Sequence, residues 1–381
     1  MDFEQEKIQR VYSWHKGKKQ GPFKIDIELH RRCNLRCLSC SRRQDKKYDY
    51  INEFSKSIEL PLEKWLSAVK DAAFLGVREW HVAGGGDPPL LRQITFPVLK
   101  EIKKFNMYGI LTTNGTNLSY ADLEFLVKIG WDRIHFSIDG ANAKTHDYLR
   151  QTKGCFDKTI NAVRNLNKIK KKYKTNKPML NINFVLSKKN YTQLPGLVKL
   201  ARKLNVEYIF AEPLIIYSEH GSRLKMDEKD LKLFGKYLQN AIKLSKKYKI
   251  DSNFTSIQSN LDSDLIKYSS SMDKVVKKDM KYYENKNEPF LELPCYDPWF
   301  HMTIKADGRV ISCDVSSDNA ENIKNKSLKE IWYGSYFNTL RRNMLQKKIP
   351  EYCRQCNPSH TTQRRWLKDM IVKGHDFKKY Q

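Results

Sequence analysis

Short apolar runs alternate with longer stretches of helical period along the first half of the chain. The short runs are rich in β-branched and aromatic residues, whereas the longer stretches have apolar residues at i, i+3 and i+4. This alternation is typical of βα units and predicts a parallel sheet. Six runs predict the strands of an incomplete barrel: FKIDIEL (23–29), EWHVAGG (79–85), YGILTT (108–113), RIHFSID (133–139), LNINFVL (180–186) and YIFAEPL (208–214). The helical stretches are LEKWLSAVKDAAFLG (62–76), FPVLKEIKKFN (96–106), ADLEFLVKIG (121–130), FDKTINAVRNLNKIKKKY (156–173) and LPGLVKLARKLN (194–205).

The pattern changes after residue 215. Residues 299–313 (WFHMTIKADGRVISC) alternate around Asp307-Gly308, a pair that predicts a two-residue hairpin turn. Residues 327–345 (SLKEIWYGSYFNTLRRNML) have the period of one amphipathic helix. We therefore divide the chain into an N-terminal extension (1–22), a barrel (23–215), a polar helical connector (216–290), a small hairpin-plus-helix domain (291–360) and a C-terminal helix or tail (361–381).

The composition is that of a globular protein. With 381 residues, 40% of them hydrophobic, the chain is long enough for one large domain and a smaller one. No apolar run has the length of a membrane span, and the N-terminus has no apolar segment of signal-peptide type, so we expect a cytoplasmic protein. The eight cysteines are then expected to bind metal rather than to form disulfides.

The formal charge of +27 raises the question of nucleic-acid binding, since Lys and Arg neutralise phosphates. Much of the excess is lysine, in runs such as 168–177 and 273–288, which lack the interleaved aromatic residues of a base-stacking surface. Such runs are typical of solvated helix faces, so nucleic acid is not the expected partner. A basic surface would suit an acidic electron-donor protein.

Three cysteines stand close together in HRRCNLRCLSC (30–40), at Cys33, Cys37 and Cys40. A closed metal site takes four protein ligands, whereas three thiolates leave one iron of a [4Fe–4S] cluster open. Structural zinc sites more often combine CxxC pairs across a longer insert. The spacing therefore favours an open cluster over zinc or unrelated core cysteines.

The stretch CNLRCLSC resembles the CxxxCxxC motif of the radical S-adenosylmethionine (radical SAM) superfamily. The resemblance covers residues 23–215 and implies a partial (β/α)6 barrel of TIM type, in which SAM chelates the fourth iron. In AGGGDPPL, the residues Gly84, Gly85, Gly86 and Asp87 resemble the family's GGE motif, which holds the SAM amino group, with Asp in place of Glu. Ser39 precedes the third cysteine where many members carry an aromatic residue, so adenine needs another packing partner.

The resemblance assigns further SAM contacts to residues that follow later strands. Arg150 resembles an arginine that meets the SAM carboxylate, and Asn190 resembles a residue that contacts the adenosine. From the residues alone, these positions are also compatible with ordinary turns and with a surface helix arginine. The full set expected near the ribose, methionine and adenosine is Thr113, Asn114, Ser137, Asp139, Arg150 and Asn190.

A second cysteine set follows at Cys295, Cys313, Cys353 and Cys356. On spacing alone these four thiols suit a tetrahedral zinc ion or a closed [4Fe–4S] cluster. The arrangement is similar to the twitch domain, the shortened SPASM domain of radical SAM enzymes, and this resemblance implies one auxiliary [4Fe–4S] cluster. The eighth cysteine, Cys155, is expected to be an apolar filler, with a thiol hydrogen donor as the alternative.

The resemblance implies that a flavodoxin- or ferredoxin-type donor reduces the open cluster and that SAM is cleaved to a 5′-deoxyadenosyl radical, which abstracts a substrate hydrogen atom. The arrangement is similar to those of 2-deoxy-scyllo-inosamine dehydrogenase and the sulfatase maturases. It implies two-electron oxidation of an alcohol or amine carbon in a sugar-like or other small metabolite. Two alternatives stay open. One is a peptide maturase that forms a crosslink or an epimer, and the other is an RNA-directed iron–sulfur protein.

A catalytic base is not assigned by the sequence. Glu212 ends the sixth predicted strand and is expected to contact substrate at the barrel mouth. The other candidates are His135, which lies inside a predicted strand, His220 and Arg150.

Overall fold

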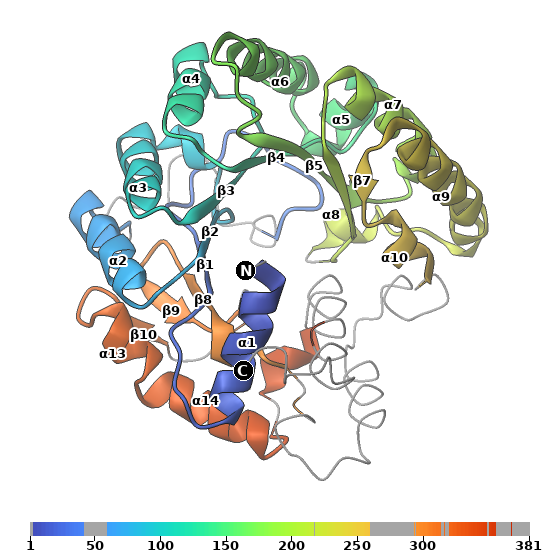
Figure 1. Ribbon diagram of the computed structural model, residues 1–381. Coiled ribbons are helices and arrows are strands. Elements are labelled where there is room, and N and C mark those ends of the chain that lie inside the picture. The colour runs from blue at the N-terminus through green and yellow to red at the C-terminus, as the bar shows by residue number, and fades with distance from the viewer. Residues whose placement is uncertain are drawn as a thin grey trace. The chain divides into compact units, whose positions relative to one another are not determined.

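The computed structural model describes residues 3–41, 59–216, 218–259, 293, 295–313, 316, 320–348, 350–355 and 367. Contacts between residues divide the chain into two compact units (Figure 1). The first unit comprises residues 1–27, 59–81 and 269–381, and the second comprises residues 28–58 and 82–268.

The second unit contains a parallel sheet in the order β3-β4-β5-β6-β7. Burial alternates along its strands, since Ile134 and Phe136 of β4 are buried whereas His135 between them is only half-buried. Alternation of this kind is typical of a strand whose two faces differ in burial. The strands are β3 (Tyr108–Thr113), β4 (Arg133–Ser137), β5 (Met179–Leu186), β6 (Tyr208–Pro213) and β7 (Asp251–Ser252).

The helices of the second unit connect these strands and form an outer layer around β3 to β6 (Figure 1). Local signals start several of them. The Ser119 hydroxyl accepts a hydrogen bond from the Asp122 amide while the Asp122 carboxylate accepts one from the Ser119 amide, which is a capping box. The elements are η2 (Pro88–Leu90), α3 (Arg92–Lys104), α4 (Tyr120–Lys128), α5 (Ala143–Arg150), α6 (Cys155–Lys172), η3 (Tyr191–Gln193), α7 (Leu194–Lys203), α8 (Glu219–Ser222), α9 (Glu228–Tyr248) and α10 (Phe254–Ser259).

The first unit holds the strand order β10-β9-β8-β1-β2. Strand β1 (Lys24–Ile27) pairs in parallel with β8 (His301–Ile304), which turns at Gly308 into the antiparallel strand β9 (Arg309–Ile311). A hairpin is present here, but the two-residue turn predicted at Asp307-Gly308 is wrong. The pairing of Ile304 with Val310 and the hydrogen bond from the Lys305 amide to the Arg309 carbonyl leave three residues, 306–308, in the turn, with Gly308 at a φ of +89°. The other elements are α1 (Phe3–His15), α2 (Leu62–Phe74), β2 (Glu79–Val82), α12 (Asp297–Phe300), β10 (Glu321–Asn322), α13 (Leu328–Trp332), α14 (Ser335–Leu345) and η4 (Glu351–Gln355). The last residue of β2, Val82, is counted with the second unit.

The single helix predicted for residues 327–345 is wrong. The structure breaks it between Trp332 and Ser335 into α13 and α14. Gly334 lies at the break, where a Cβ atom would stand 2.5 Å from the Glu330 carbonyl oxygen. The close approach of the two backbones therefore requires a residue without a side chain.

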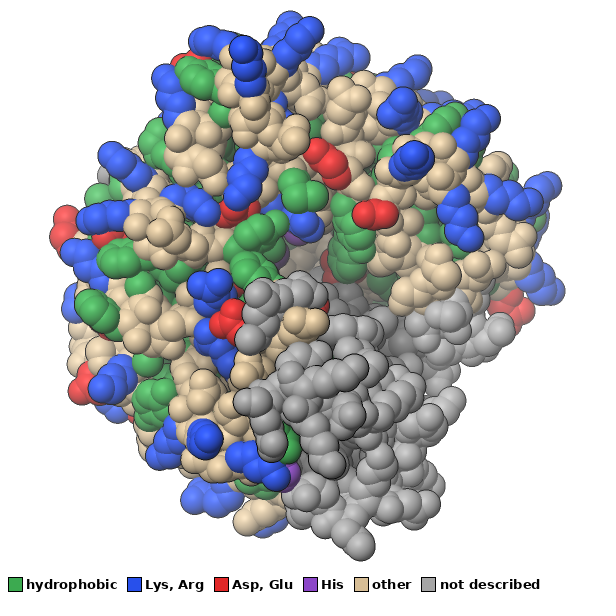
Figure 2. All heavy atoms as spheres, in the orientation of Figure 1, with side chains coloured by type: hydrophobic (Ala, Val, Ile, Leu, Met, Phe, Trp, Pro, Cys, Tyr) green, Lys and Arg blue, Asp and Glu red, His purple; other side chains and the backbone are tan. Residues whose placement is uncertain are grey.

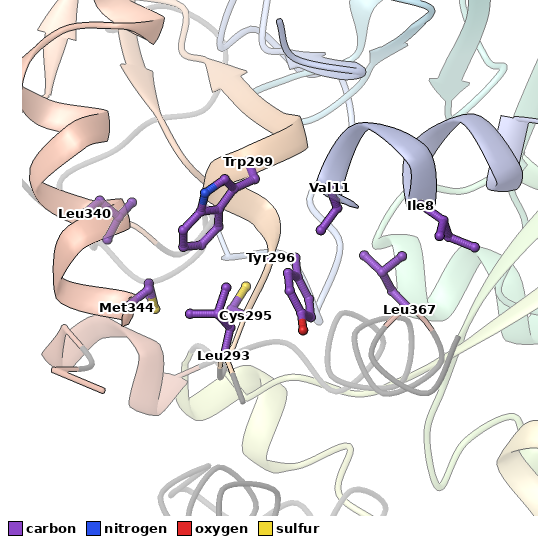
Figure 3. Close-up of a cluster of buried hydrophobic side chains, with 9 residues drawn as sticks. All are labelled: Ile8, Val11, Leu293, Cys295, Tyr296, Trp299, Leu340, Met344 and Leu367. Atoms are coloured by element: carbon purple, nitrogen blue, oxygen red, sulfur yellow. The ribbon is translucent and has the colours of Figure 1, made fainter. Parts of the chain in front are cut away.

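Two elements lie where no such element was predicted. Helix α1 occupies most of the predicted N-terminal extension and buries Ile8 and Val11 against Tyr296 and Trp299 (Figure 3). Strand β7 lies within the predicted helical connector and pairs in parallel with β6. Its two residues are too short a run for a period-two pattern to be recognised. Among the described helices, none combines the length and apolarity needed to cross a membrane.

Candidate functional site

The three clustered cysteines lie on one loop that follows β1. The loop is anchored to the end of α5, because the Leu38 amide donates to the Leu149 carbonyl (2.9 Å) and the Arg36 amide donates to the Arg150 carbonyl (3.3 Å). Leu35, inside the motif, is buried. All three thiols therefore lie on one loop, and backbone hydrogen bonds and a buried leucine fix this loop within the second unit.

The thiols lie close enough to influence one another. Burial raises the pKa of Cys33 to about 12, and the neighbouring Cys37 and Cys40 add to the rise. Burial also raises the pKa of Cys37. Metals bind the deprotonated thiolate form of cysteine. A positively charged iron–sulfur core would stabilise that form of these cysteines and displace their protons.

The glycine-rich turn after β2 packs directly on the backbone of the cysteine loop. Gly84 and Gly85 have φ values of +75° and +58°, and the Asp87 amide donates to the Arg32 carbonyl (2.8 Å). A Cβ atom on Gly86 would lie 1.9 Å from the Arg32 oxygen. The three glycines therefore permit a close approach that any side chain would prevent.

Asp87 is held at the centre of this site with one oxygen unused. Its Oδ1 accepts hydrogen bonds from the Thr113 hydroxyl and the Asn114 amide, both at 2.8 Å. Its Oδ2 is buried and has no hydrogen-bond partner among the described residues. Burial raises the pKa of Asp87 to about 6. An orphaned buried carboxylate oxygen fits a cationic ligand group, and the ammonium of SAM is such a group.

Thr113 and Asn114, both expected near the SAM ribose, contribute their side chains to the framework of the site. Asn114 donates through Nδ2 to Asn34 Oδ1 (2.9 Å) and accepts the Thr116 amide (2.8 Å). Asn34 lies inside the CNLRCLSC motif, and sequence analysis did not select it. The structure joins the cysteine loop, the turn after β2 and the end of β3, whereas the contacts to the ribose stay a prediction.

Arg150 is not a surface helix arginine, which was the alternative left open by the sequence. Its side chain is 11% exposed, and Nη2 lies 2.7 Å from Asp139 Oδ2. Nη1 donates to Cys37 Sγ at 3.5 Å, while Nε is buried without a hydrogen-bond partner in the part of the chain described. Burial opposes the charge of the guanidinium, but the Asp139 carboxylate and the Cys37 thiol together outweigh it and raise the pKa of Arg150. A SAM carboxylate near this group stays a prediction.

The side-chain amide of Asn190 is hydrogen-bonded within the protein. Its Oδ1 accepts the Ser187 amide (2.8 Å) and hydroxyl (3.0 Å), and its Nδ2 donates to the carbonyls of Asp139 (2.9 Å) and Val185 (2.8 Å). All four bonds are made within the protein, and the contact between this amide and adenosine stays a prediction. Ser137 is half-buried at the end of β4, paired with Asn183 of β5, and its SAM contact stays a prediction.

The candidates for substrate chemistry lie on several elements. Glu212 is half-buried on β6, and His135 lies on β4 with Nε2 3.0 Å from Asn181 Nδ2. His220 belongs to α8. The Cys155 thiol donates to Asp147 Oδ1 at 3.2 Å, and burial together with this carboxylate raises its pKa to about 12. A buried thiol of this kind is unreactive, in keeping with the expected filler.

The second cysteine set lies in the first unit. Cys295 is buried in an apolar cluster with Trp299 and Met344, and Cys353 packs against the same cluster (Figure 3). Cys313 is also buried, and the Tyr352 phenol lies near both Cys313 and Cys353. Cys356 falls outside the described residues. Of the predicted ligands that the structure describes, Cys295 and Cys313 are thus buried and Cys353 is partly buried.

Sequence analysis also missed His30, which precedes the first cysteine by three positions. Its Nδ1 accepts the Arg32 amide (3.1 Å), and its Nε2 lies 3.1 Å from the Pro88 carbonyl oxygen, which ties the two loops together. A polar residue just after the end of a parallel strand was the signal that could have identified it.

The fold consists of parallel βα units, and a three-cysteine loop follows its first strand. This loop packs against a glycine-rich turn and lies near a buried carboxylate oxygen without a partner among the described residues. The arrangement suits an open iron–sulfur cluster and a cationic cosubstrate. Residues 27–186 match the Radical SAM superfamily, and residues 295–357 match SPASM, an iron–sulfur cluster-binding domain. The chain belongs to the radical SAM superfamily and carries a C-terminal SPASM domain. It is a radical SAM enzyme whose cofactors are [4Fe–4S] clusters and SAM, and the predicted α/β class with a partial TIM-type barrel is confirmed.

Among curated proteins, PqqA peptide cyclase of Gluconobacter oxydans (strain 621H) is 24% identical over 342 residues, covering 88% of this chain and 82% of that protein. Streptococcus suis SuiB bound to S-adenosylmethionine has a TM-score of 0.63 at 18% identity, covering 88% of this chain and 72% of that chain. Native anSMEcpe with bound AdoMet has a TM-score of 0.59 at 19% identity, covering 92% and 97%.

Proposed function

We propose that this protein modifies a peptide substrate by radical SAM chemistry. The observation that carries the proposal is the similarity to PqqA peptide cyclase over 88% of this chain. Two proteins of similar fold have also been solved with peptides, SuiB with the precursor peptide SuiA and anSMEcpe with the Kp18Cys peptide. The expected oxidation of a small metabolite therefore gives way to the alternative, a maturase that forms a crosslink or an epimer.

The residues of the cysteine loop and the glycine-rich turn have complementary tasks in this proposal. Cys33, Cys37 and Cys40 hold three irons of the cluster, and Asp87 Oδ2 accepts the SAM ammonium. When bound, the cluster and SAM would supply radical hydrogen-atom abstraction from the substrate. The ion pair between Arg150 and Asp139 holds the end of α5 to the segment after β4, and Arg150 Nη1 also donates to Cys37 Sγ in the cysteine loop.

The auxiliary cysteines and the basic surface have proposed roles in electron flow. Cys295, Cys313, Cys353 and Cys356 would hold the auxiliary [4Fe–4S] cluster, which would supply an acceptor for one electron. Lys and Arg side chains are spread over the outer helices on the face in Figure 2 rather than gathered in one stripe. This distribution suits an acidic flavodoxin- or ferredoxin-type donor through overall potential. Glu212 stays the proposed contact to substrate.

The test uses the full chain with both clusters reconstituted anaerobically, SAM and dithionite. The probes are synthetic peptides that match the short open reading frames beside its gene, prepared with and without deuterium. We expect one peptide to accelerate formation of 5′-deoxyadenosine, to transfer deuterium into it, and to lose two hydrogen atoms or invert a stereocentre.

The matched controls separate the two cysteine sets. Cys37→Ala should abolish SAM cleavage, whereas Cys313→Ala should retain SAM cleavage without peptide and lose the completed modification. The proposal would be contradicted if a low-mass metabolite fraction accelerated formation of 5′-deoxyadenosine and none of the peptides did. That result would favour oxidation of a small metabolite.

A further inference from the structure

Arg341 of α14 is a buried cation whose side chain has one unused nitrogen. The residue is 5% exposed. Its Nε donates to the Pro298 carbonyl (2.9 Å), and its Nη1 donates to the Trp332 carbonyl (2.8 Å) and to Asn338 Oδ1 (3.1 Å). Its Nη2 is buried and has no hydrogen-bond partner among the described residues. Within the described part of the chain, the guanidinium is therefore bonded only to neutral acceptors.

Aromatic rings surround this cation in the first unit. The Arg341 Cζ atom lies 4.4 Å from the ring centroid of Trp332, 4.6 Å from that of Trp14 and 5.3 Å from that of Phe337. The faces of these rings attract a cation, but they do not replace a counter-ion. Burial lowers the pKa of Arg341 to about 9, and no carboxylate of the described residues opposes this effect. The guanidinium thus stays charged at neutral pH without a described partner of opposite charge.

The Trp14 indole supplies a second unused donor next to the first. Its Nε1 is buried and has no hydrogen-bond partner in the described ranges. An indole N–H and a guanidinium N–H can only donate hydrogen bonds. Two donors on side chains in direct contact therefore lack an acceptor, and native proteins contain few buried donors of this kind. The Trp332 indole, by contrast, donates to the Gln20 carbonyl at 2.8 Å.

The donors and the charge together indicate the class of ligand. Both unused groups require acceptor atoms, and the guanidinium also requires a negative charge. Arg10, which acts on the pKa of Tyr333 together with Arg341, is already paired with Glu6 at 2.6 Å. One positive charge therefore remains to be balanced, and a phosphate dianion would leave an excess negative charge in the interior. A carboxylate carries one charge and two acceptor oxygens, and it suits the donor geometry of arginine.

We propose that Arg341 and Trp14 form a binding site for a carboxylate, which accepts hydrogen bonds from Arg341 Nη2 and Trp14 Nε1. Trp14 is half-buried and Asn338 is exposed, so the site lies close to the surface of the first unit. Two sources share this chemistry, namely a free carboxylate and an acidic side chain of a peptide. The site does not depend on the proposed function, because its two residues have no assigned part in holding SAM or a cluster.

The experiment uses the full chain with both clusters loaded and with tryptophan labelled with the heavy nitrogen isotope. Nuclear magnetic resonance follows the indole N–H signals as sodium acetate replaces sodium chloride at constant ionic strength. Trp14→Phe assigns the Trp14 signal. We expect this signal to shift and to saturate with acetate. The Trp131 indole in the second unit already donates to the Arg133 carbonyl (3.0 Å), and its signal should stay in place.

Two arginine variants test the role of the charge. Arg341→Gln should abolish the shift of the Trp14 signal, whereas Arg342→Gln, on the exposed neighbour in α14, should leave it unchanged. If Arg341→Gln does not fold, Trp14→Phe provides the second test, because it keeps an aromatic ring and removes the N–H. Acetate should raise the urea midpoint of the wild type, and Trp14→Phe should need about tenfold more acetate for the same rise.

A peptide with an amidated C-terminus and one internal glutamate as its only carboxylate identifies the source. A shift at lower concentration than acetate requires, lost in the glutamine version, supports an acidic side chain of a peptide. A shift with acetate alone supports a free carboxylate. No shift with either probe, or a shift that persists in folded Arg341→Gln, overturns the proposal. These outcomes require no SAM turnover, so they stay readable if no peptide is modified.

Discussion

The imidazole Nε2 of His301 lies 3.1 Å from Asp26 Oδ2, although 275 positions separate the two residues in the chain. Parallel pairing of β1 with β8 brings them together, with Lys24 opposite His301 in the register. The other oxygen of Asp26 lies 3.0 Å from Lys24 Nζ and 3.7 Å from His81 Nδ1. Three basic groups thus converge on one buried carboxylate.

This cluster predicts a pH-dependent stability. Burial disfavours both charges, but Lys24 and His301 hold the pKa of Asp26 well below its usual range, and Asp26 raises the pKa of His301. The contribution of Asp26 is present above about pH 4 and is lost as the pH falls below it. The contribution of His301 is complete below about pH 6.5 and is lost as the pH rises through its raised pKa.

The variant His301→Gln should lower the free energy of unfolding by about 3 kcal/mol near pH 6, because it leaves a buried carboxylate without this partner. The loss should be smaller near pH 9. Urea unfolding of the cluster-loaded protein measures both. Glu219→Gln, which removes an exposed ion pair to Arg223, should change the free energy by less than about 0.5 kcal/mol. Identical losses at the two pH values would contradict this assignment.

Asp87→Asn should weaken SAM binding by roughly 10- to 100-fold, which is the worth of a charge-assisted hydrogen bond of about 1.5–3 kcal/mol. The asparagine oxygen can still accept from Thr113 and Asn114, so the iron content should not fall. Titration of SAM into the reduced enzyme, followed by the paramagnetic resonance signal, measures the affinity.

The same residue predicts how SAM affinity depends on pH. The pKa of Asp87 is raised to about 6, so the carboxylate is protonated below this value and cannot pair with an ammonium. Affinity in the wild type should rise from about pH 5 to about pH 7 and then level off. The profile of Asp87→Asn should be flat over this range, while that of the exposed control Asp157→Asn should follow the wild type.

Gly86→Ala should remove the SAM-binding cluster and spare the auxiliary one. The new Cβ would stand 1.9 Å from the Arg32 oxygen, which moves the backbone beside Cys33. Iron per chain should fall from about eight to about four atoms, measured after reconstitution. Gly235→Ala places the same methyl group in open space on α9 and should leave the iron content unchanged. Full iron in Gly86→Ala would show that the turn tolerates the displacement.

The ion pair between Arg150 and Asp139 can be tested by a double-mutant cycle. Each of Arg150→Met and Asp139→Asn leaves one buried charge alone and should cost about 3–5 kcal/mol of unfolding free energy. The double variant should lose clearly less than the sum, since it buries neither charge. Strictly additive losses would mean that the two groups stabilise the protein independently.

Much of the framework follows from local sequence alone. Strand β3 begins and ends at the predicted residues 108 and 113. A short apolar run bounded by turn residues is typical of a buried strand, so its ends can be located from the sequence. The cysteine spacing in residues 33–40 and the glycine-rich turn likewise predicted which segments meet at the SAM site. Helix α1 could not be recognised in this way, since its apolar face is defined by Trp299 and Tyr296, nearly three hundred residues away.

The sequence by itself determined the βα alternation, the presence of a hairpin around Asp307-Gly308 and the identity of the thiols, because each depends on neighbours along the chain. Only the tertiary structure decided that Arg150 pairs with Asp139, that the Asn190 side chain is hydrogen-bonded within the protein, and that Asp26 contacts His301. These relationships depend on which distant groups share one buried volume. The attraction between two charges is stronger where both are buried. The periodicity of the sequence does not show which distant residues share a buried region.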